Sequence, residues 1–364
     1  MSAMYILIVF VPSVFVVLLS KALFRHHITM KEWCVQAGAV FVSTLLMWMI
    51  SLFGGLSWSY DTEVLNGYVT SKAPVEVTCT HEHQCGETCW KDKDGKRHCK
   101  PKYCKDHAYD VDWDVRTTVG TATISRVDKR GLIEPPRFTQ AKIGEPAANV
   151  GFGKNYMLID SEHFHTSEAI MEKYKNVLPD YPRITDYYRI NRVINDTQQD
   201  YSWINTYLND QLRLLGKAKQ LNIVVVVTKN PYDYYTAIRQ HWSGTKRNDV
   251  QLYYGVDAEG NITWFKADSF ADGQSNNVML DMLRTPTLQA KLTPAVVEEQ
   301  VGIIKDKFVR LHNEQLAYLK EQWSPSIGFI VFLTLFNLII TCGIAFAFIR
   351  EDAGEFEFIK RNAH

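Results

Sequence analysis

The chain has 364 residues, with 40 acidic and 40 basic side chains, so its formal net charge is zero. This balance gives no electrostatic reason to expect nucleic acid as a partner, because there is no excess of Lys and Arg to neutralise phosphates. The length allows one large domain or two small ones beside any membrane segments.

Three long stretches, residues 1–20, 33–60 and 324–349, contain no Asp, Glu, Lys or Arg. Each is long enough to cross about 30 Å of hydrocarbon as a helix. We therefore predict transmembrane helices at residues 1–24, 33–60 and 324–349. The first lacks a positive region before its apolar run, which favours a retained helix over a cleaved signal peptide. Asn337, in the third, is expected to bond a neighbouring helix.

The turn at residues 25–32 sets the predicted orientation. It carries Arg25 and Lys31, and its only acid is its last residue, Glu32. The positive-inside rule places this turn in the cytoplasm. The large loop, residues 61–323, then lies outside the cytoplasm, and the tail at residues 350–364 lies inside.

A dense cysteine cluster follows the second apolar stretch. Outside the cytoplasm, such a cluster predicts a small region held together by disulfides. Five of the seven cysteines fall within residues 79–107: Cys79, Cys85, Cys89, Cys99 and Cys104.

An Asp-Gly turn signal lies midway between Cys89 and Cys99, and it predicts a β-hairpin that brings these two cysteines together. Cys85 and Cys104 would then form the next disulfide, farther from the turn, and Cys79 would be unpaired. Four cysteines allow three connectivities, so other pairings stay open.

Zinc binding is the alternative interpretation, because histidines alternate with the thiols and Cys/His sets are suitable tetrahedral ligands. No Cys-x-x-Cys pair is present. Disulfides are favoured in an oxidising compartment and zinc in a reducing cytoplasm. The zinc ligands would come from Cys79, His81, His83, Cys85, Cys89, His98, Cys99, Cys104 and His107.

Residues 61–160 are predicted to form a β-rich region that contains the cysteine knob at residues 79–107. Its clearest strand runs from Asp110 to Arg116, where Val111, Trp113 and Val115 alternate with acidic residues. This alternation is typical of a strand with one buried face and one solvated face, and it places the acids on the solvated face.

Residues 161–293 predict an α/β domain. A helical pattern at residues 200–221 precedes the β-branched run at residues 223–227, which is typical of a strand buried on both faces. A second helix at residues 231–242 and strands at 250–256 and 262–265 follow. This order describes an α/β sandwich.

Two short motifs resemble the TPM domain, an α/β fold of membrane-anchored extracytoplasmic proteins. His241-Trp242-Ser243-Gly244 and the segment at residues 246–250 stand where that family has a Trp-x-Gly sequence and an Asn-Gly-containing strand. The match covers about residues 200–310. Asp249 replaces the family's Gly, and the Gly-rich segment after the hairpin is missing. The resemblance implies phosphatase activity, metal binding or assembly and repair of membrane complexes.

A second resemblance concerns the stretch from Val77 through the cysteines to the segment Glu134-Pro135-Pro136-Arg137. It is similar to uncharacterised membrane proteins of tailed bacteriophages and their bacterial hosts. This resemblance carries no known chemistry.

Catalytic motifs are scarce in the large loop. It has no Gly-x-Ser-x-Gly, no phosphate-binding glycine loop and no His-Glu-x-x-His. Acidic residues at strand and helix ends, and two histidines at strand spacing, could bind a divalent metal; caps and solvated turns are the other interpretation. No cofactor is predicted, and the metal candidates are Asp233, Asp249, Asp257, His163 and His165.

The last soluble segment, residues 294–323, predicts a helix that leads toward the third apolar stretch. Apolar residues repeat along it at alternating spacings of four and three. Such a stripe packs either on its own domain or between chains as a stalk that forms a homo-oligomer. Its members are Val297, Val301, Ile304, Phe308 and Leu311.

The sequence thus predicts a membrane-anchored α+β protein of the bacterial inner (cytoplasmic) membrane. We expect a non-enzymatic interaction or scaffolding module, with the lipid bilayer and other envelope proteins as partners and with a phage-encoded role at the host membrane. The alternatives are a metal-dependent, phosphatase-like hydrolase in the α/β domain and an oligomeric transporter or channel subunit.

Overall fold

The chain divides into two compact units. One comprises residues 1–61, 154–163 and 312–364, and the other comprises residues 62–153 and 164–311. The structure is a computed structural model that describes residues 4–57, 59–159, 165–270, 274–312, 314 and 326–362.

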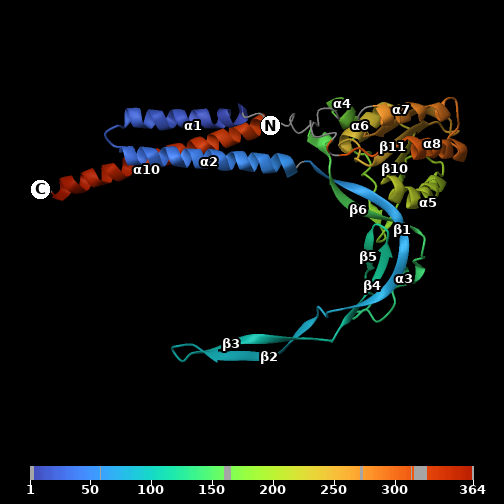
Figure 1. Cartoon of the computed structure of the whole chain (residues 1–364), viewed down its shortest axis with the longest axis horizontal. Helices are drawn as coiled ribbons and strands as arrows, with labels where there is room; N and C mark the ends of the chain where they lie inside the picture. Colours follow the sequence, from blue (N-terminus) through green and yellow to red (C-terminus); the bar gives the residue numbers. More distant parts are fainter. Residues whose placement is uncertain are drawn as a thin grey trace. The chain divides into compact units, whose positions relative to one another are not determined.

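The first unit is built on three helices, α1 (Met4–Leu23), α2 (Met30–Ser57) and α10 (Ile327–Asn362), which pack side by side (Figure 1). Among the described residues, only Met30–Ile50 and Ile327–Glu351 are long and apolar enough to cross a membrane. The prediction of three such segments is therefore wrong in number. The apolar part of α1, Ile8–Leu23, is shorter than the roughly 20 residues that span hydrocarbon.

Polar side chains face inward between these helices. The amide nitrogen of Asn337 in α10 donates to Ser13 Oγ at 2.9 Å and to Thr44 Oγ1 at 3.0 Å. The Ser43 hydroxyl donates to the amide oxygen of Asn337. One side chain therefore links α10 to both α1 and α2, as predicted for Asn337.

Large apolar side chains face outward from the same helices. The exposed fractions of Phe15, Phe41 and Ile339 are 63%, 61% and 69%, whereas Gln36 and Thr341 are fully buried. Gln36 Nε2 donates to the Thr341 carbonyl at 3.2 Å. These helices bury polar side chains among apolar ones and expose large apolar side chains, which is a distribution expected where the solvent is itself apolar.

The second unit contains two four-stranded sheets. The first has the order β5-β4-β1-β6. Its core contains Trp113 and Phe138, whose rings lie 4.8 Å apart, with Phe138 supplied by the short helix α3 (Pro136–Gln140). The strands are β1 (Tyr60–Val77), β4 (Asp110–Thr117), β5 (Gly120–Ile124) and β6 (Pro146–Lys154).

The predicted alternation along β4 is largely confirmed. Trp113 and Val115 are buried, and Asp112 and Asp114 are partly exposed. Asp110 departs from the pattern because its side chain is fully buried rather than solvated. The reason is that β4 begins at the point where the neighbouring hairpin joins the sheet, so other side chains cover Asp110.

The second sheet has the order β12-β11-β10-β9. Strand β10 runs parallel to β9 and β11, and β12 is antiparallel to β11. The predicted order of helix, strand, helix, strand, turn and strand is confirmed; the three-residue β9 was not predicted. The elements are β9 (Val193–Asn195), α5 (Ser202–Lys219), β10 (Asn222–Thr228), α6 (Asp233–His241), β11 (Asp249–Val256) and β12 (Ile262–Ser269).

Helices cover both faces of this sheet. Ile223, Val225 and Val227 of β10 pack in one core with α5, α7 (Gln274–Met282) and α8 (Pro294–Lys307). Val224 and Val226 pack in the other core, with α4 (Glu168–Tyr174) and α6. The continuous β-branched run is thus explained by burial on both faces. Shorter elements are η1 (Tyr156–Ile159), β7 (Ile184–Thr185), β8 (Arg189–Ile190) and η3 (Thr285–Thr287).

The apolar stripe near the end of this unit is buried within the unit. Helix α8 ends at Lys307, and Phe308 is in an extended conformation rather than part of a helix that continues toward residue 323. The stripe packs on its own domain, the other interpretation of the pattern. Its residues are buried in the unit: Val297, Val301, Ile304, Phe308 and Leu311.

A buried arginine joins the two sheets. Arg192 is only 2% exposed, and burial lowers its pKa to about 10. Its Nε donates to Asn209 Oδ1 at 2.8 Å, and its two terminal nitrogens donate to the side-chain oxygens of Asn66 in β1 and Asn222 in β10. Gly216 of α5 permits this contact, because a Cβ there would lie 2.0 Å from the Asn66 carbonyl oxygen.

Replacing Arg192 by Met should lower the free energy of unfolding by about 3–5 kcal/mol, because three buried amide oxygens lose their donor. The full-length protein in detergent would be unfolded by denaturant and followed by tryptophan fluorescence. Arg183→Met is the matched control, since the Arg183 side chain is 78% exposed, and it should change the stability by less than about 0.5 kcal/mol. Equal effects of the two substitutions would contradict the bridging role.

Candidate functional site

The candidate site is a β-hairpin with no hydrophobic core of its own. It consists of β2 (Glu82–Lys91) and β3 (Arg97–Lys105), and it extends beyond β1 and β4 (Figure 1). Every residue of β2 is exposed, and in β3 only Cys104 is partly buried. At the turn, the Asp92 carboxylate accepts bonds from the backbone nitrogens of Asp94 and Lys96 at 3.0 and 2.9 Å. Covalent links must therefore supply the order that packing does not.

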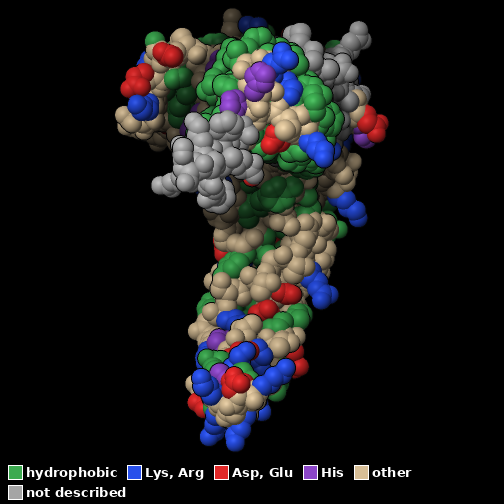
Figure 2. All heavy atoms as spheres, turned by 90° about the vertical axis from the view of Figure 1, so that its left-hand side faces the viewer, with side chains coloured by type: hydrophobic (Ala, Val, Ile, Leu, Met, Phe, Trp, Pro, Cys, Tyr) green, Lys and Arg blue, Asp and Glu red, His purple; other side chains and the backbone are tan. Residues whose placement is uncertain are grey.

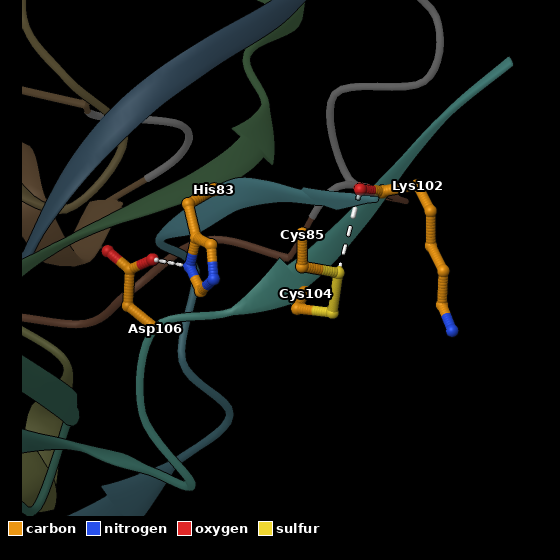
Figure 3. The surroundings of a disulfide bond; sticks show 5 residues. All are labelled: His83, Cys85, Lys102, Cys104 and Asp106. Carbon is orange, nitrogen blue, oxygen red and sulfur yellow. Dashed lines mark hydrogen bonds and ion pairs between the residues drawn. A yellow bond between two sulfur atoms is a disulfide. The ribbon is translucent and has the colours of Figure 1, made fainter. Parts of the chain in front are cut away.

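Two disulfides supply these links, in the pairing that the hairpin pattern predicted. Cys89 pairs with Cys99, and Cys85 pairs with Cys104 (Figure 3). Cys79 is the cysteine left over, and it is free and buried, as predicted. The Cys89–Cys99 disulfide lies near the turn and the Cys85–Cys104 disulfide lies near the sheet, so the two exposed strands are cross-linked at both ends of the hairpin.

A contact between His83, Asp106 and Lys129 lies next to the Cys85–Cys104 disulfide. His83 Nδ1 is 2.8 Å from the Asp106 carboxylate, on the hairpin side that leads to the sheet (Figure 3). Lys129 Nζ lies 2.6 Å from the other oxygen of Asp106. The bonds from Lys129 and then His83 lower the pKa of Asp106 to about 2. Asp106 therefore stays ionised and ties the hairpin to the loop after β5.

One side of the hairpin is cationic and aromatic. Cross-strand pairing puts Trp90 opposite His98, Thr88 opposite Lys100 and Gly86 opposite Lys102. The Trp90 and His98 rings stack at 5.8 Å, and Lys100 Nζ lies 5.5 Å from the centre of the Trp90 ring. We call this surface the cationic face; its strand residues are Gly86, Thr88, Trp90, His98, Lys100 and Lys102, none of them acidic.

The hairpin as a whole is positively charged. Residues 82–105 contain six Lys and one Arg against four acidic residues, a net charge of +3 in a protein whose total is zero. Figure 2 shows Lys and Arg side chains gathered at this end of the molecule. Trp90 and Tyr103 are 45% and 58% exposed. Exposed aromatic rings such as these are enriched at protein-binding surfaces.

A second cluster lies where the hairpin meets the sheet. Cys79 and His81 lie between β1 and β2, His107 lies between β3 and β4, and Asp110 is the first residue of β4. The Asp106 backbone nitrogen donates to the His81 carbonyl at 3.0 Å, which holds the two segments together. We call these four side chains the root cluster.

The ligand-type atoms of the root cluster converge on one point. Cys79 Sγ lies 3.2 Å from His107 Nδ1 and 3.9 Å from His81 Nδ1. The Asp110 carboxylate lies 3.1 Å from His107 Nδ1 and 3.3 Å from His81 Nδ1. All four atoms lie within 4.8 Å of one another.

Arg126 fixes the carboxylate of this cluster. Its guanidinium lies 2.9 Å from Asp110 and 2.8 Å from Asp112. Burial acts to raise the pKa of Asp110, but the bonds from Arg126, Cys79, the Thr80 backbone and His107 outweigh it and lower the pKa to about 2. Asp110 is therefore an anion with an orientation set by Arg126.

Of the residues proposed as zinc ligands, only Cys79, His81 and His107 come together. The other four cysteines form disulfides, His83 bonds Asp106, and His98 lies 2.7 Å from Asp92. The sequence pattern did not identify Asp110, because the alternation along β4 placed its side chain on the solvent-exposed face of the strand. The sequence does contain a signal for the cluster. The pair Cys79-x-His81 lies just before the four disulfide cysteines, and the pair His107-x-x-Asp110 lies just after them.

The three acidic metal candidates of the α/β part do not come together. Asp249 starts β11 and Asp257 follows its end, so the eight-residue strand separates them by about 26 Å. Asp249 is buried, which raises its pKa, and it bonds Tyr181 and Asn222. Asp257 accepts bonds within its own turn, from the backbone nitrogens of Glu259 and Asn261.

Asp233 lies at the start of α6, where Lys173 and Tyr174 bond it at 2.6 and 2.7 Å. His165 is exposed, and His163 lies outside the described residues, so the predicted histidine pair is not tested. Asp233, Asp249, Asp257 and His165, the four candidates that lie within the described residues, belong to no group there that could hold a metal.

A hollow of about 810 Å³ lies along the edge strand β12, between α6 and α7. Two of its lining groups contact Asp268: Arg239 Nε lies 2.9 Å from this carboxylate, and the Tyr235 hydroxyl donates to it at 3.0 Å. None of the sequence-predicted acids lines it.

Comparison with known proteins gives no match: neither a family model, nor a curated protein, nor a solved structure is similar to this chain. The resemblances to the TPM domain and to phage-encoded membrane proteins stay predictions.

Reducing both disulfides should loosen the hairpin selectively, because it has no packed core to hold it. Each bridge is expected to contribute about 2–4 kcal/mol to hairpin order. Limited trypsin digestion of the full-length protein, with and without reductant, should show cleavage at Lys91–Lys102 only after reduction. The control is the α5 segment, which should stay protected in both cases. Equal cleavage of the hairpin before and after reduction would contradict this expectation.

Proposed function

We propose that this protein is a membrane-anchored interaction module of the bacterial envelope, which presents the stapled hairpin outside the cytoplasm to an acidic surface of another envelope protein. The observation that carries the proposal is a rigid, fully exposed, cationic hairpin held by two disulfides. Ordering an exposed hairpin costs conformational entropy, and the hairpin has no packed core that would explain why it is ordered.

The proposed location outside the cytoplasm is supported by redox chemistry and by charge. Disulfides persist in oxidising compartments and are rare in the cytoplasm. Basic residues in the turn at residues 25–32 favour a cytoplasmic position for that turn. This topology requires only the two long apolar helices: the chain leaves the cytoplasm through α2 and returns to it through α10. Helix α1 packs against both of them.

The hairpin is suited to binding because its conformation is fixed in advance. A flexible loop loses conformational entropy when it binds, whereas a cross-linked hairpin has already lost it on folding. The stacked Trp90 and His98 rings add a rigid aromatic surface. Large, rigid aromatic groups dominate the binding energy of many interfaces.

The charge of the cationic face favours an acidic partner. A protein surface fits better than a lipid surface, because residues 82–105 contain no Val, Leu, Ile, Met or Phe. Trp90 and Tyr103 alone offer little apolar area for insertion into a bilayer, and interfacial binding grows with that area.

The proposal predicts a charge-dependent contact at the cationic face. A photo-crosslinking amino acid at Thr88, with the full-length protein in its membrane, should give one discrete protein adduct. Lys100→Glu with Lys102→Glu should reduce the adduct by about tenfold or more, because two favourable charges become unfavourable. The matched control is Lys142→Glu with Lys217→Glu, both exposed and remote from the hairpin in sequence, which should leave the adduct unchanged.

An adduct that contains only lipid would contradict the choice of a protein partner. An adduct that is insensitive to the Lys100 and Lys102 charge reversals would contradict the role of the cationic face.

A further inference from the structure

The root cluster contains a free thiol in a region where the other cysteines are paired. Cys79 is completely buried, and the four cysteines of the hairpin form two disulfides. Its sulfur does not face an apolar pocket, as a structural buried cysteine would. It faces His107 Nδ1 at 3.2 Å and His81 Nδ1 at 3.9 Å.

Hydrogen bonds within the cluster are available: the Cys79 thiol donates to the His81 carbonyl at 3.5 Å, and His81 and His107 face different oxygens of Asp110. Cys79, His81, His107 and Asp110 nevertheless each turn one ligand-type atom toward a shared centre, and these four atoms lie within 4.8 Å of one another. A cation at that centre would satisfy all four groups at once.

The distances fit tetrahedral zinc. Bonds of about 2.3 Å to sulfur and about 2.0–2.2 Å to nitrogen and oxygen set neighbouring ligand atoms about 3.3–3.6 Å apart. Cys79 Sγ lies 3.2 Å from His107 Nδ1 and 3.9 Å from His81 Nδ1. The Oδ1 of Asp110 lies 3.1 Å from His107 Nδ1, and its Oδ2 lies 3.3 Å from His81 Nδ1. Three of these separations are close to the tetrahedral range, and the one between Cys79 and His81 is longer. Thiolate and imidazole ligands favour zinc over calcium or magnesium, which take oxygen ligands.

The surroundings supply the outer support that metal sites usually have. Arg126 bonds both Asp110 and Asp112 and so orients the carboxylate ligand. Cys79 and Asp110 are fully buried, and the side chains of His81 and His107 are 31% and 19% exposed. The site is thus shielded, with access through the imidazole rings.

We propose that Cys79, His81, His107 and Asp110 bind one Zn²⁺ ion as a structural site. Four protein ligands close the coordination sphere, which distinguishes a structural site from a catalytic one with an open position. Binding displaces the thiol proton of Cys79, and the thiolate is then held by the metal. The ion joins the two chain segments at the base of the hairpin and acts as a third cross-link, after the two disulfides.

The test measures metal in the full-length protein, purified in detergent without a polyhistidine tag. Elemental analysis should find about one zinc per chain. Cys79→Ser and His107→Ala should each retain at most about a tenth of that zinc, because a ligand is lost. His83→Ala and His98→Ala are the matched controls, since both histidines lie on the hairpin outside the root cluster, and both variants should retain full zinc.

Two further readouts separate metal loss from misfolding. Peptide mapping without reduction should find both disulfides intact in Cys79→Ser, which shows that the hairpin still forms. Cobalt added to the zinc-free wild-type protein should give a thiolate charge-transfer absorption band that Cys79→Ser lacks. Zinc retained by Cys79→Ser, a stoichiometric metal other than zinc, or metal-free protein that gives no cobalt band would each overturn the proposal.

Discussion

A buried guanidinium links the two four-stranded sheets of the second unit. Arg192 donates to Asn66 of β1 and to Asn222 of β10, and these two strands belong to different sheets. A buried arginine without a carboxylate partner is costly, and here several amide oxygens compensate for its lost hydration. Because only a few positions can satisfy all its donors, the network fixes where β1 passes the α/β core.

Strand β1 connects the α/β part of the unit to the hairpin. Beyond Asn66, the strand pairs with β4 from Val69 to Val77 and then leads into the root cluster and the hairpin. Stability is supplied differently along this path. The α/β part relies on apolar cores on both faces of its sheet, and the hairpin relies on disulfides and ion pairs. Interaction surfaces need exposed polar and aromatic groups, and covalent links allow such a surface to stay ordered.

The sequence predicts those features that depend on local pattern. The β-branched run at β10, the alternation of Trp113 and Val115, and the turn between Cys89 and Cys99 each fix a local structure. Strand pairing then brings the cysteines together as expected. Three members of the root cluster are among the predicted zinc ligands, but Asp110 escapes prediction because it depends on where β4 begins: Asp110 is the first residue of a strand, and its burial comes from the other chain segment at the base of the hairpin. The network of Arg192 escapes for the same reason, since its three asparagines are distant in sequence.

The central claim is that α2 and α10 hold the hairpin unit outside the cytoplasm, and labelling from one side of the membrane tests it most directly. In a background with Cys34 and Cys342 replaced by Ala, single cysteines would be introduced as Lys217→Cys, on the exposed surface of α5, and Lys31→Cys, in α2 next to the basic turn. A membrane-impermeant maleimide added to intact cells with a permeable outer layer should label position 217 and not position 31. Labelling of position 31 with protection of position 217 would contradict the account.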